Sequence, residues 1–315
     1  MESKNNWKAW LYLAPVIILM AVFTFYPIIN TIGISFLKNY DSLMHTNDGF
    51  TFDNYLEILM IKPKTEIGVI KVYITDFIQV ALPNTLLITF ITVPISILLA
   101  LAIAIALNSV KFMQKIFQTI FFMPYVTNAI AIGMVFSIIF DNNGIINYLF
   151  KTNIAWIYAG SSGSNPSYWA ALFALCTYIV WHSLPYKILI FLGGLQNIDG
   201  QYYDAARVDG SNKFKIIRRI TIPLLSPQIL YVMITSFIGA FKEYTSVVAL
   251  FGGTGSLTKT SWGASSMLTV AYYIYNQMSK TNTMQYAAAG AVILFIIILF
   301  FTLIQKIVAK KRVHY

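Results

Sequence analysis

One apolar segment, 169–195, carries ring side chains and polar groups on a single helical face. Its members recur at i, i+3, i+4, i+7 and i+8, and they are Tyr178, Trp181, His182, Pro185 and Tyr186. Aromatic rings on one face usually pack in a core, but buried phenol, indole and imidazole groups need hydrogen-bond partners. The pattern therefore allows two interpretations: a packing face, or a binding face for a ligand rich in hydroxyl groups.

Three charged residues interrupt apolar segments: Lys187, Lys242 and Glu243. A charge at membrane depth costs at least about 2.5–3.5 kcal/mol, so such groups snorkel, pair with each other or face a cavity. Lys242 and Glu243 are neighbours that would point about 100° apart on a helix, which is poor geometry for an ion pair. A role in lining a pathway stays open for all three.

The residues that enzymes commonly use for catalysis or metal binding form no recognisable motif in this sequence. The three histidines, His45, His182 and His314, are far apart, and the single Cys176 lies in an apolar run, which excludes a disulfide framework or a thiolate metal cluster. The segment GGTGSLTKTS (252–261) lacks the glycine that precedes lysine in a phosphate-binding loop. We expect no metal site, no bound cofactor and no catalytic role for this chain.

The composition indicates an integral membrane protein. Of 315 residues, 57% are hydrophobic and 11% are charged, against roughly 25% charged in soluble domains. A bilayer span needs about 20 apolar residues in a helix, and six segments qualify. They run near 10–36, 82–107, 116–140, 169–195, 222–251 and 286–308. The first is too long for a signal peptide, so we predict an all-α protein with one six-span membrane domain over 1–315.

The basic residues predict the orientation. With the N-terminus inside, the inner segments hold thirteen Lys and Arg residues and the longer outer loops hold seven. The positive-inside bias then places both termini in the cytoplasm, and it explains the net charge of +10 by lipid headgroups rather than by nucleic acid. Outside the membrane, we expect a small amphipathic element within 37–80 and a turn-rich loop at 161–167.

The inner loop 198–221 concentrates charged residues in an otherwise apolar chain. The pattern predicts a short helix over 202–208, a turn at Gly210 and a second helix capped by Ser211 that leads to Pro223. Local chemistry therefore builds an elbow of two helices.

Two interpretations of this elbow compete. A basic connector held by lipid headgroups explains Arg218 and Arg219, but it does not explain the small and aromatic residues Tyr203, Ala205, Ala206 and Phe214. A helix with a small-residue face among charges is the kind of surface that docks into a groove on another protein.

The elbow resembles the Glu-Ala-Ala loop of permease subunits in binding-protein-dependent ABC importers. The matching residues are Asp204, Ala205, Ala206, Gly210, Phe214, Ile220 and Pro223, with Asp209 before the glycine. In that family the first helix of the loop fits a cleft on the cytoplasmic ATPase. The resemblance thus implies ATPase-coupling roles for Tyr203, Asp204, Ala205, Ala206, Asp209, Gly210, Phe214 and Pro223. Asp204 departs from the pattern, because it is one methylene shorter than the usual Glu.

Other segments resemble the carbohydrate-importer branch of this family, which includes the larger maltose permease. They are FDNY (52–55), the run at 83–108, FMPYVTNAIAIGMVF (122–136) and FGGTGS (251–256). The resemblance implies the type I importer fold, with six spans in a bacterial cell membrane. It also implies three partners: a second homologous permease subunit, an ATPase dimer that binds ATP and Mg²⁺, and an external solute-binding protein.

The same resemblance implies a sugar cavity between the third, fourth and fifth spans. The candidate substrate-binding residues are Asn128, His182, Ser183, Tyr186 and Glu243. Glu243 differs from the mainly neutral groups of the family site. A polyol-like or glycerol-phosphate-type solute is an alternative cargo. A secondary transporter would need inverted repeats or proton-relay acids, and a membrane enzyme would need clustered catalytic groups.

Overall fold

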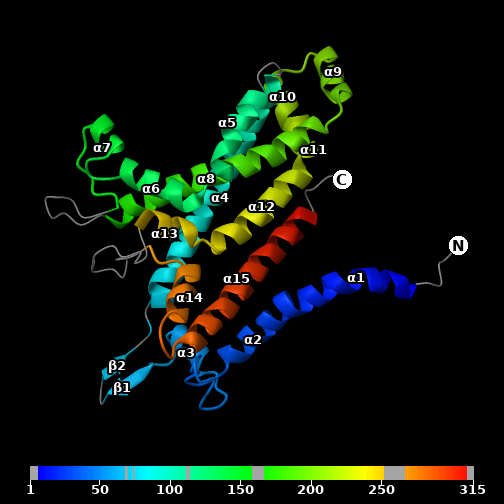
Figure 1. Ribbon diagram of the computed structural model, residues 1–315. Coiled ribbons are helices and arrows are strands. Elements are labelled where there is room, and N and C mark those ends of the chain that lie inside the picture. Colours follow the sequence, from blue (N-terminus) through cyan, green and yellow to red (C-terminus); the bar gives the residue numbers. More distant parts are fainter. Residues whose placement is uncertain are drawn as a thin grey trace. The chain divides into compact units, whose positions relative to one another are not determined.

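A computed structural model describes residues 6–67, 70–72, 74, 76–110, 114–157, 167–251 and 267–310. In the described chain the regular elements are helices and one antiparallel hairpin, β1 (Thr65–Ile67) with β2 (Ile70–Val72) (Figure 1). It divides into unit 1, residues 1–77 and 273–295, and unit 2, residues 78–272 and 296–315. The turn-rich loop at 161–167, except Ser167, and the 252–261 segment lie outside the described residues.

Four described helical segments are long and apolar enough to cross a membrane, and they agree with four of the predicted spans. The bounds are Trp10–Ser35, Asp76–Ser109, Tyr168–Gln196 and Met284–Lys310. The first contains α1 (Asn6–Met20), the π-helical η1 (Ala21–Phe25) and α2 (Tyr26–Ser35); the second contains η2 (Asp76–Ala81) and α4 (Leu82–Ser109); the others are α8 (Tyr168–Gln196) and α15 (Met284–Lys310). A helix satisfies its own backbone hydrogen bonds, which is why apolar runs of this length adopt it.

The other two predicted spans are bent. The third consists of α5 (Gln114–Val126) and α6 (Ala129–Ile139), with a 95° bend. The fifth begins with α10 (Lys213–Ile216), η3 (Ile217–Thr221) and α11 (Ile222–Leu224), then turns by 67° into α12 (Ser226–Phe241). Counting each bent pair as one span gives six in the described chain.

The spans predicted near 116–140 and 222–251 are therefore present as bent pairs of helices and not as single straight helices. Hydropathy records how apolar a segment is and does not record where its helix stops. A second break separates α12 from α13 (Thr245–Phe251). Lys242 directly follows the last residue of α12, and Glu243 lies in this break. The two residues are therefore not neighbours on one helix.

The core of unit 2 lies where α4 packs along α8, with α12 against both (Figure 1). Ala100 and Ala104 of α4 are fully buried against larger side chains of α8, among them Phe191 and Leu192. Small residues let two helix backbones approach closely, and close packing is the main attraction between helices in a lipid environment. The α4–α8 pair thus forms the packed centre of this unit.

Polar side chains of α4 hold a distant segment of unit 2 in place. The amide of Asn84 donates to the Leu268 carbonyl (3.0 Å) and its oxygen accepts from the Tyr168 hydroxyl (2.8 Å). The hydroxyl of Thr85 accepts from the Val270 backbone N–H (2.9 Å). These bonds position the chain just before α14 (Val270–Met278).

In unit 1, the predicted amphipathic element is α3 (Asp53–Ile58). Asn54 is buried and donates to the carbonyls of Ser35 (2.9 Å) and Leu37 (2.8 Å), which closes the chain that follows α2. Glu57 accepts a hydrogen bond from the Tyr286 hydroxyl of α15 at 2.5 Å. Unit 1 is thus tied together by side-chain bonds as well as by apolar contact.

Candidate functional site

A cavity of about 280 Å³ lies within unit 2, lined by α4, α5, α8, α12 and the break after α12. Its aromatic and polar lining residues are Thr92, Tyr125, His182, Ser183, Tyr186, Lys187, Thr235, Ser236 and Glu243. Apolar walls with a few convergent polar groups are typical of small-molecule sites. This cavity is therefore the candidate substrate site.

One wall of the cavity is aromatic. The rings of Tyr125 and Tyr186 are stacked, with centroids 5.8 Å apart and planes 18° apart. The hydroxyls of Tyr186 and Tyr231 lie 3.1 Å apart, within hydrogen-bond distance. Sequence reasoning named Tyr186 and missed Tyr125, because the two are on different helices and only their packing brings them together.

The helical face predicted on α8 is divided between packing and cavity. Tyr178 is fully buried and donates through its hydroxyl to the Ala129 carbonyl (2.6 Å). Trp181 packs on Phe136, with ring centroids 5.2 Å apart. His182, in contrast, lines the cavity. The packing interpretation therefore holds for Tyr178 and Trp181, whereas His182 is available to a ligand in the cavity.

Lys187 is buried beside the cavity. Its ammonium group donates to the hydroxyl of Ser96 on α4 and to that of Ser183 on α8, the latter at 3.1 Å. No ion pair of Lys187 occurs in the described chain. Ser96 carried no signal of its own in the sequence, since it is 91 residues away from Lys187.

Two of the five predicted substrate residues cap the helices that follow the breaks. Asn128 ends the bend before α6, where its side-chain oxygen accepts from the backbone N–H groups of Ile130 (2.9 Å) and Ala131 (3.3 Å). Glu243 accepts from the N–H of Ser246 (2.9 Å) in the first turn of α13. Such bonds satisfy N–H groups that have no partner within the helix.

The structure brings four of the five predicted substrate residues to one cavity. These four are His182, Ser183, Tyr186 and Glu243, and Asn128 is not among the lining residues. Glu243 has two positions in the structure: it lines the cavity and caps α13. Asn128 has a local role at the bend.

The helices that follow the two breaks pack directly against each other. A Cβ atom added at Gly133 of α6 would lie 2.3 Å from the Cβ of Ala249 in α13, and 3.2 Å from its backbone. Only glycine permits this approach at position 133. The α6–α13 contact therefore depends on two small residues.

The second candidate site is the elbow between α8 and α12. Its first helix is α9 (Gly200–Val208), which Asp199 caps by accepting from the Gln201 N–H (3.0 Å). Gly210 has φ +66°, the left-handed conformation that glycine adopts without strain. The predicted helix and turn are thus present.

The predicted cap of the second helix is displaced by one residue. The cap is Asn212, whose side-chain oxygen accepts from the Lys215 N–H at 2.8 Å, and Ser211 instead donates its N–H to the Ala206 carbonyl (3.0 Å). Asn and Ser both serve as caps, so the sequence did not distinguish two neighbouring candidates. The hydrogen bond from the Ser211 N–H to α9 keeps Ser211 in the turn, so that the second helix begins after Asn212.

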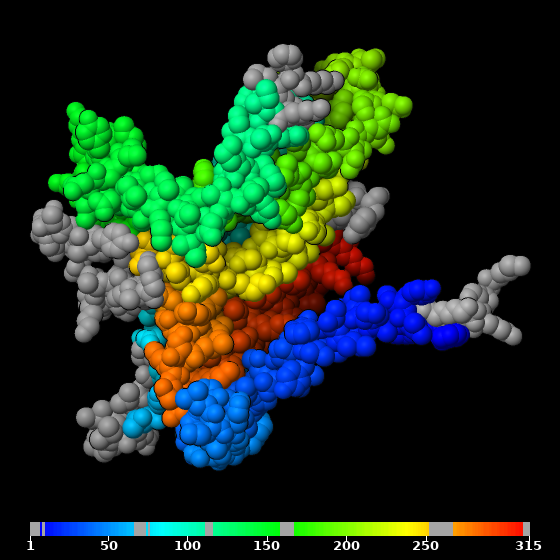
Figure 2. Space-filling model, in the orientation of Figure 1, coloured from blue at the N-terminus to red at the C-terminus, as the bar shows by residue number. Residues whose placement is uncertain are grey.

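The predicted coupling residues lie within one stretch of the elbow. Asp204, Ala205, Asp209, Gly210 and Phe214 are exposed, Tyr203 and Pro223 are half-buried, and Ala206 is buried. The outer side of α9, yellow-green in Figure 2, is open at the surface of unit 2. The Tyr203 and Thr221 hydroxyls lie 3.4 Å apart, which links the two helices.

Asp204 also forms an ion pair within α9. Its carboxylate lies 3.1 Å from the guanidinium of Arg207, and both side chains are largely exposed. Exposed pairs contribute at most about 1 kcal/mol, so this contact leaves Asp204 available to another protein.

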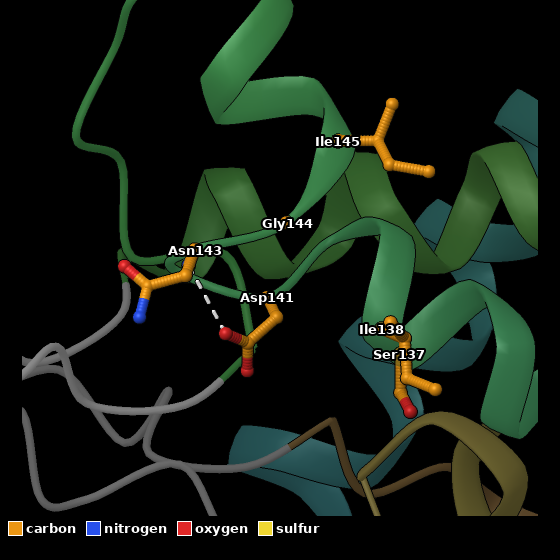
Figure 3. Close-up of a pocket in the computed structure, with 6 residues that line it drawn as sticks. All are labelled: Ser137, Ile138, Asp141, Asn143, Gly144 and Ile145. Carbon is orange, nitrogen blue, oxygen red and sulfur yellow. Dashed lines mark hydrogen bonds between the residues drawn. The ribbon is translucent and has the colours of Figure 1, made fainter.

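A separate hollow of about 330 Å³ lies at the turn between α6 and α7 (Ile145–Phe150). Asp141 accepts there from the Asn143 backbone N–H (3.0 Å), and Ile145 points away from these two residues (Figure 3). Asp141 is its one ionisable group. No cluster of metal-binding side chains occurs among the described residues. The hollow is a surface turn without an assembled set of chemical groups.

Residues 96–314 match the family model described as the binding-protein-dependent transport system inner membrane component. The chain is similar to the lactose transport system permease protein LacF of Rhizobium radiobacter, with 29% identity over 97% of this chain and 95% of the relative. It is also similar to the arabinooligosaccharides transport system permease protein AraP of Bacillus subtilis, with 31% identity over 94% of this chain and 86% of the relative.

A solved structure shares the fold. It is a crystal structure of a bacterial ABC transporter involved in the import of the acidic polysaccharide alginate, with a TM-score of 0.74 and 18% identity over 98% of this chain and 96% of that one. At this identity the similarity supports the fold alone. It agrees with the helical architecture described above.

Proposed function

The chain belongs to the family of binding-protein-dependent transport system inner membrane components, and from this premise we propose that it forms the translocation pathway of an ATP-driven carbohydrate importer. The names of both relatives specify sugars. The cavity in unit 2 is the observation that carries the proposal, because it combines a tyrosine wall with hydroxyl, imidazole and carboxylate groups. Stacked rings suit the C–H faces of a sugar ring, and the polar groups suit its hydroxyls.

We assign the substrate contacts to His182, Ser183, Tyr186 and Glu243, supported by their common position on the cavity. We retain Asn128 as a positioning residue, because it caps α6 beside the α5–α6 bend. A second homologous permease subunit would complete the pathway as a heterodimer. In this proposal the whole chain acts as one membrane domain with both termini in the cytoplasm.

The proposed coupling surface is the elbow, whose residues are exposed except for the buried Ala206 and the half-buried Tyr203 and Pro223. It comprises Tyr203, Asp204, Ala205, Ala206, Asp209, Gly210, Phe214 and Pro223. Exposed Ala205 beside exposed charges supports docking, because a small side chain lets another protein approach the helix closely. The ATPase partner would bind ATP and Mg²⁺, and this chain would bind neither.

The proposed mechanism has two states. Closure of the ATPase dimer moves the elbow, and the helices joined to it switch the cavity from inward-facing to outward-facing. The capped, glycine-containing turn supports this mechanism, because a rigid elbow transmits a push better than a solvated loop does. An external solute-binding protein then delivers the sugar.

The test is copurification of the tagged full complex from membranes. Wild-type chain should bring down a protein with a nucleotide-binding phosphate loop, and Ala205→Asp should lower its yield at least about tenfold, which corresponds to about 1.4 kcal/mol of affinity. Ala205 is exposed, so the variant should still enter the membrane.

Leu43→Asp is the matched control, because it adds the same charge at an exposed position of unit 1. It should leave the ATPase yield unchanged. Normal ATPase recovery and normal sugar uptake with Ala205→Asp would refute the coupling surface. Absence of any ATPase from the wild-type complex would favour a secondary transporter.

A further inference from the structure

We propose that Lys187 selects a cargo with an anionic group, so that the transported carbohydrate carries a carboxylate or a phosphate. This inference rests on the proposed function of the cavity. Its basis is an imbalance between the two charged groups that line that cavity, Lys187 and Glu243.

The lysine is buried without a countercharge. Lys187 is 6% exposed, and its partners are the hydroxyls of Ser96 and Ser183. An ammonium group has three donors, and the described residues use two of them. Hydroxyls accept hydrogen bonds but carry no charge, so the positive charge stays uncompensated, which is costly for a buried group.

The carboxylate has a partner supplied by the chain itself. Glu243 accepts from the backbone N–H of Ser246 (2.9 Å). No ion pair joins Glu243 to Lys187 in the described chain. The Glu243 carboxylate therefore holds the start of α13, whereas the Lys187 ammonium group keeps one donor for a ligand in the cavity.

Hydrogen bonds to two serines hold the Lys187 ammonium group in a defined position. Ser96 comes from α4 and Ser183 lies one turn before Lys187 on α8, so the ammonium is held between two helices. The stacked rings of Tyr125 and Tyr186 line the same cavity. Together they offer a ring platform and a cation to one ligand, which is the chemistry of an acidic or phosphorylated sugar.

Ligand selection by this lysine can be tested with the complete complex and its solute-binding protein in proteoliposomes. The probes are digalacturonate, glucose 6-phosphate and neutral lactose, each measured as ATP-dependent uptake. We expect uptake of digalacturonate or glucose 6-phosphate in preference to lactose, and the active probe distinguishes carboxylate from phosphate. Lys187→Met should lower that uptake at least about tenfold, and Lys187→Arg, which keeps the charge, should retain clearly more uptake than Lys187→Met does.

Lys242→Met is the matched control, because Lys242 is an exposed cation next to Glu243 that does not line the cavity. It should leave uptake unchanged. An equal loss of anionic and neutral uptake in Lys187→Met, or no rescue by arginine, would assign Lys187 a structural role and overturn the proposal.

The wild-type result separates this inference from the function on which it rests. Uptake of lactose alone overturns the anionic cargo and leaves the carbohydrate importer standing. Uptake of no probe by a complex that holds its ATPase also overturns the anionic cargo. Absence of the ATPase overturns the importer itself.

Discussion

Different interactions stabilise the continuous helices of unit 2 and its broken helices. The pair α4 and α8 meets over many side chains, each of which contributes a little. The pairs α5–α6 and α12–α13 depend on a few specific contacts: two capping side chains, one tyrosine hydroxyl and one glycine. A single substitution should cost little stability where many contacts share an interface, and more where one atom or one side chain makes the contact.

The broken helices also lie next to the candidate site. Glu243 caps α13 and lines the cavity, and Tyr125 lies in the last turn of α5, just before the bend. In membrane proteins, irregular backbone is tolerated where it lines a cavity or is buried in protein. The breaks therefore lie beside the candidate site, and single substitutions at their contacts should have graded effects on stability.

The largest effect is expected from Gly133→Val. Its Cβ would lie 2.3 Å from that of Ala249, and overpacking of this kind costs about 3 kcal/mol. The apparent melting temperature of the detergent-purified complex should fall strongly. Gly193→Ala is the control, because its added Cβ meets no side chain and no backbone outside its own helical turn within 4 Å. Equal melting temperatures for the two variants would show that the α6–α13 contact does not carry this stability.

A smaller loss is expected from Tyr178→Phe. The variant removes only the hydroxyl that donates to the Ala129 carbonyl (2.6 Å) at the start of α6, which costs about 1.5 kcal/mol when the acceptor stays partly buried. The melting temperature should drop by less than in Gly133→Val. Thr177→Val, which removes an exposed hydroxyl on the same helix, should change it little; a larger drop there would contradict the assignment.

Next in size is Asn128→Ala. Loss of a capping side chain costs about 1 kcal/mol, because the N–H groups of Ile130 and Ala131 lose their acceptor. Asn128→Asp should recover the loss by restoring the oxygen. If Asn128→Asp melts as Asn128→Ala does while both lose sugar uptake, Asn128 contacts the cargo rather than the helix.

The smallest effect on stability is expected from Glu243→Gln. The amide keeps an oxygen that can accept from Ser246, so the loss should stay under about 1 kcal/mol. Glu243→Ala removes the acceptor and should melt lower. If both variants melt alike, the cap is not what Glu243 contributes.

Local features were readable from the sequence. Four spans follow from unbroken apolar runs, and the elbow follows from Gly210 and the residues around it, because capping and turn chemistry act within a few residues. The missed details are also local but finely balanced. Ser211 and Asn212 are both competent caps, and only the register of the turn chose Asn212.

The sequence by itself thus determined which segments are apolar, where the elbow turns and which charges need an explanation. The tertiary structure decided where the third and fifth spans bend and which groups meet. Ser96 reaches Lys187 across 91 residues, and Tyr125 stacks on Tyr186 from another helix. Gly133 matters only because Ala249 lies against it. Periodicity describes a helix and its own faces, whereas a cavity depends on how separate helices pack, and no single segment records that.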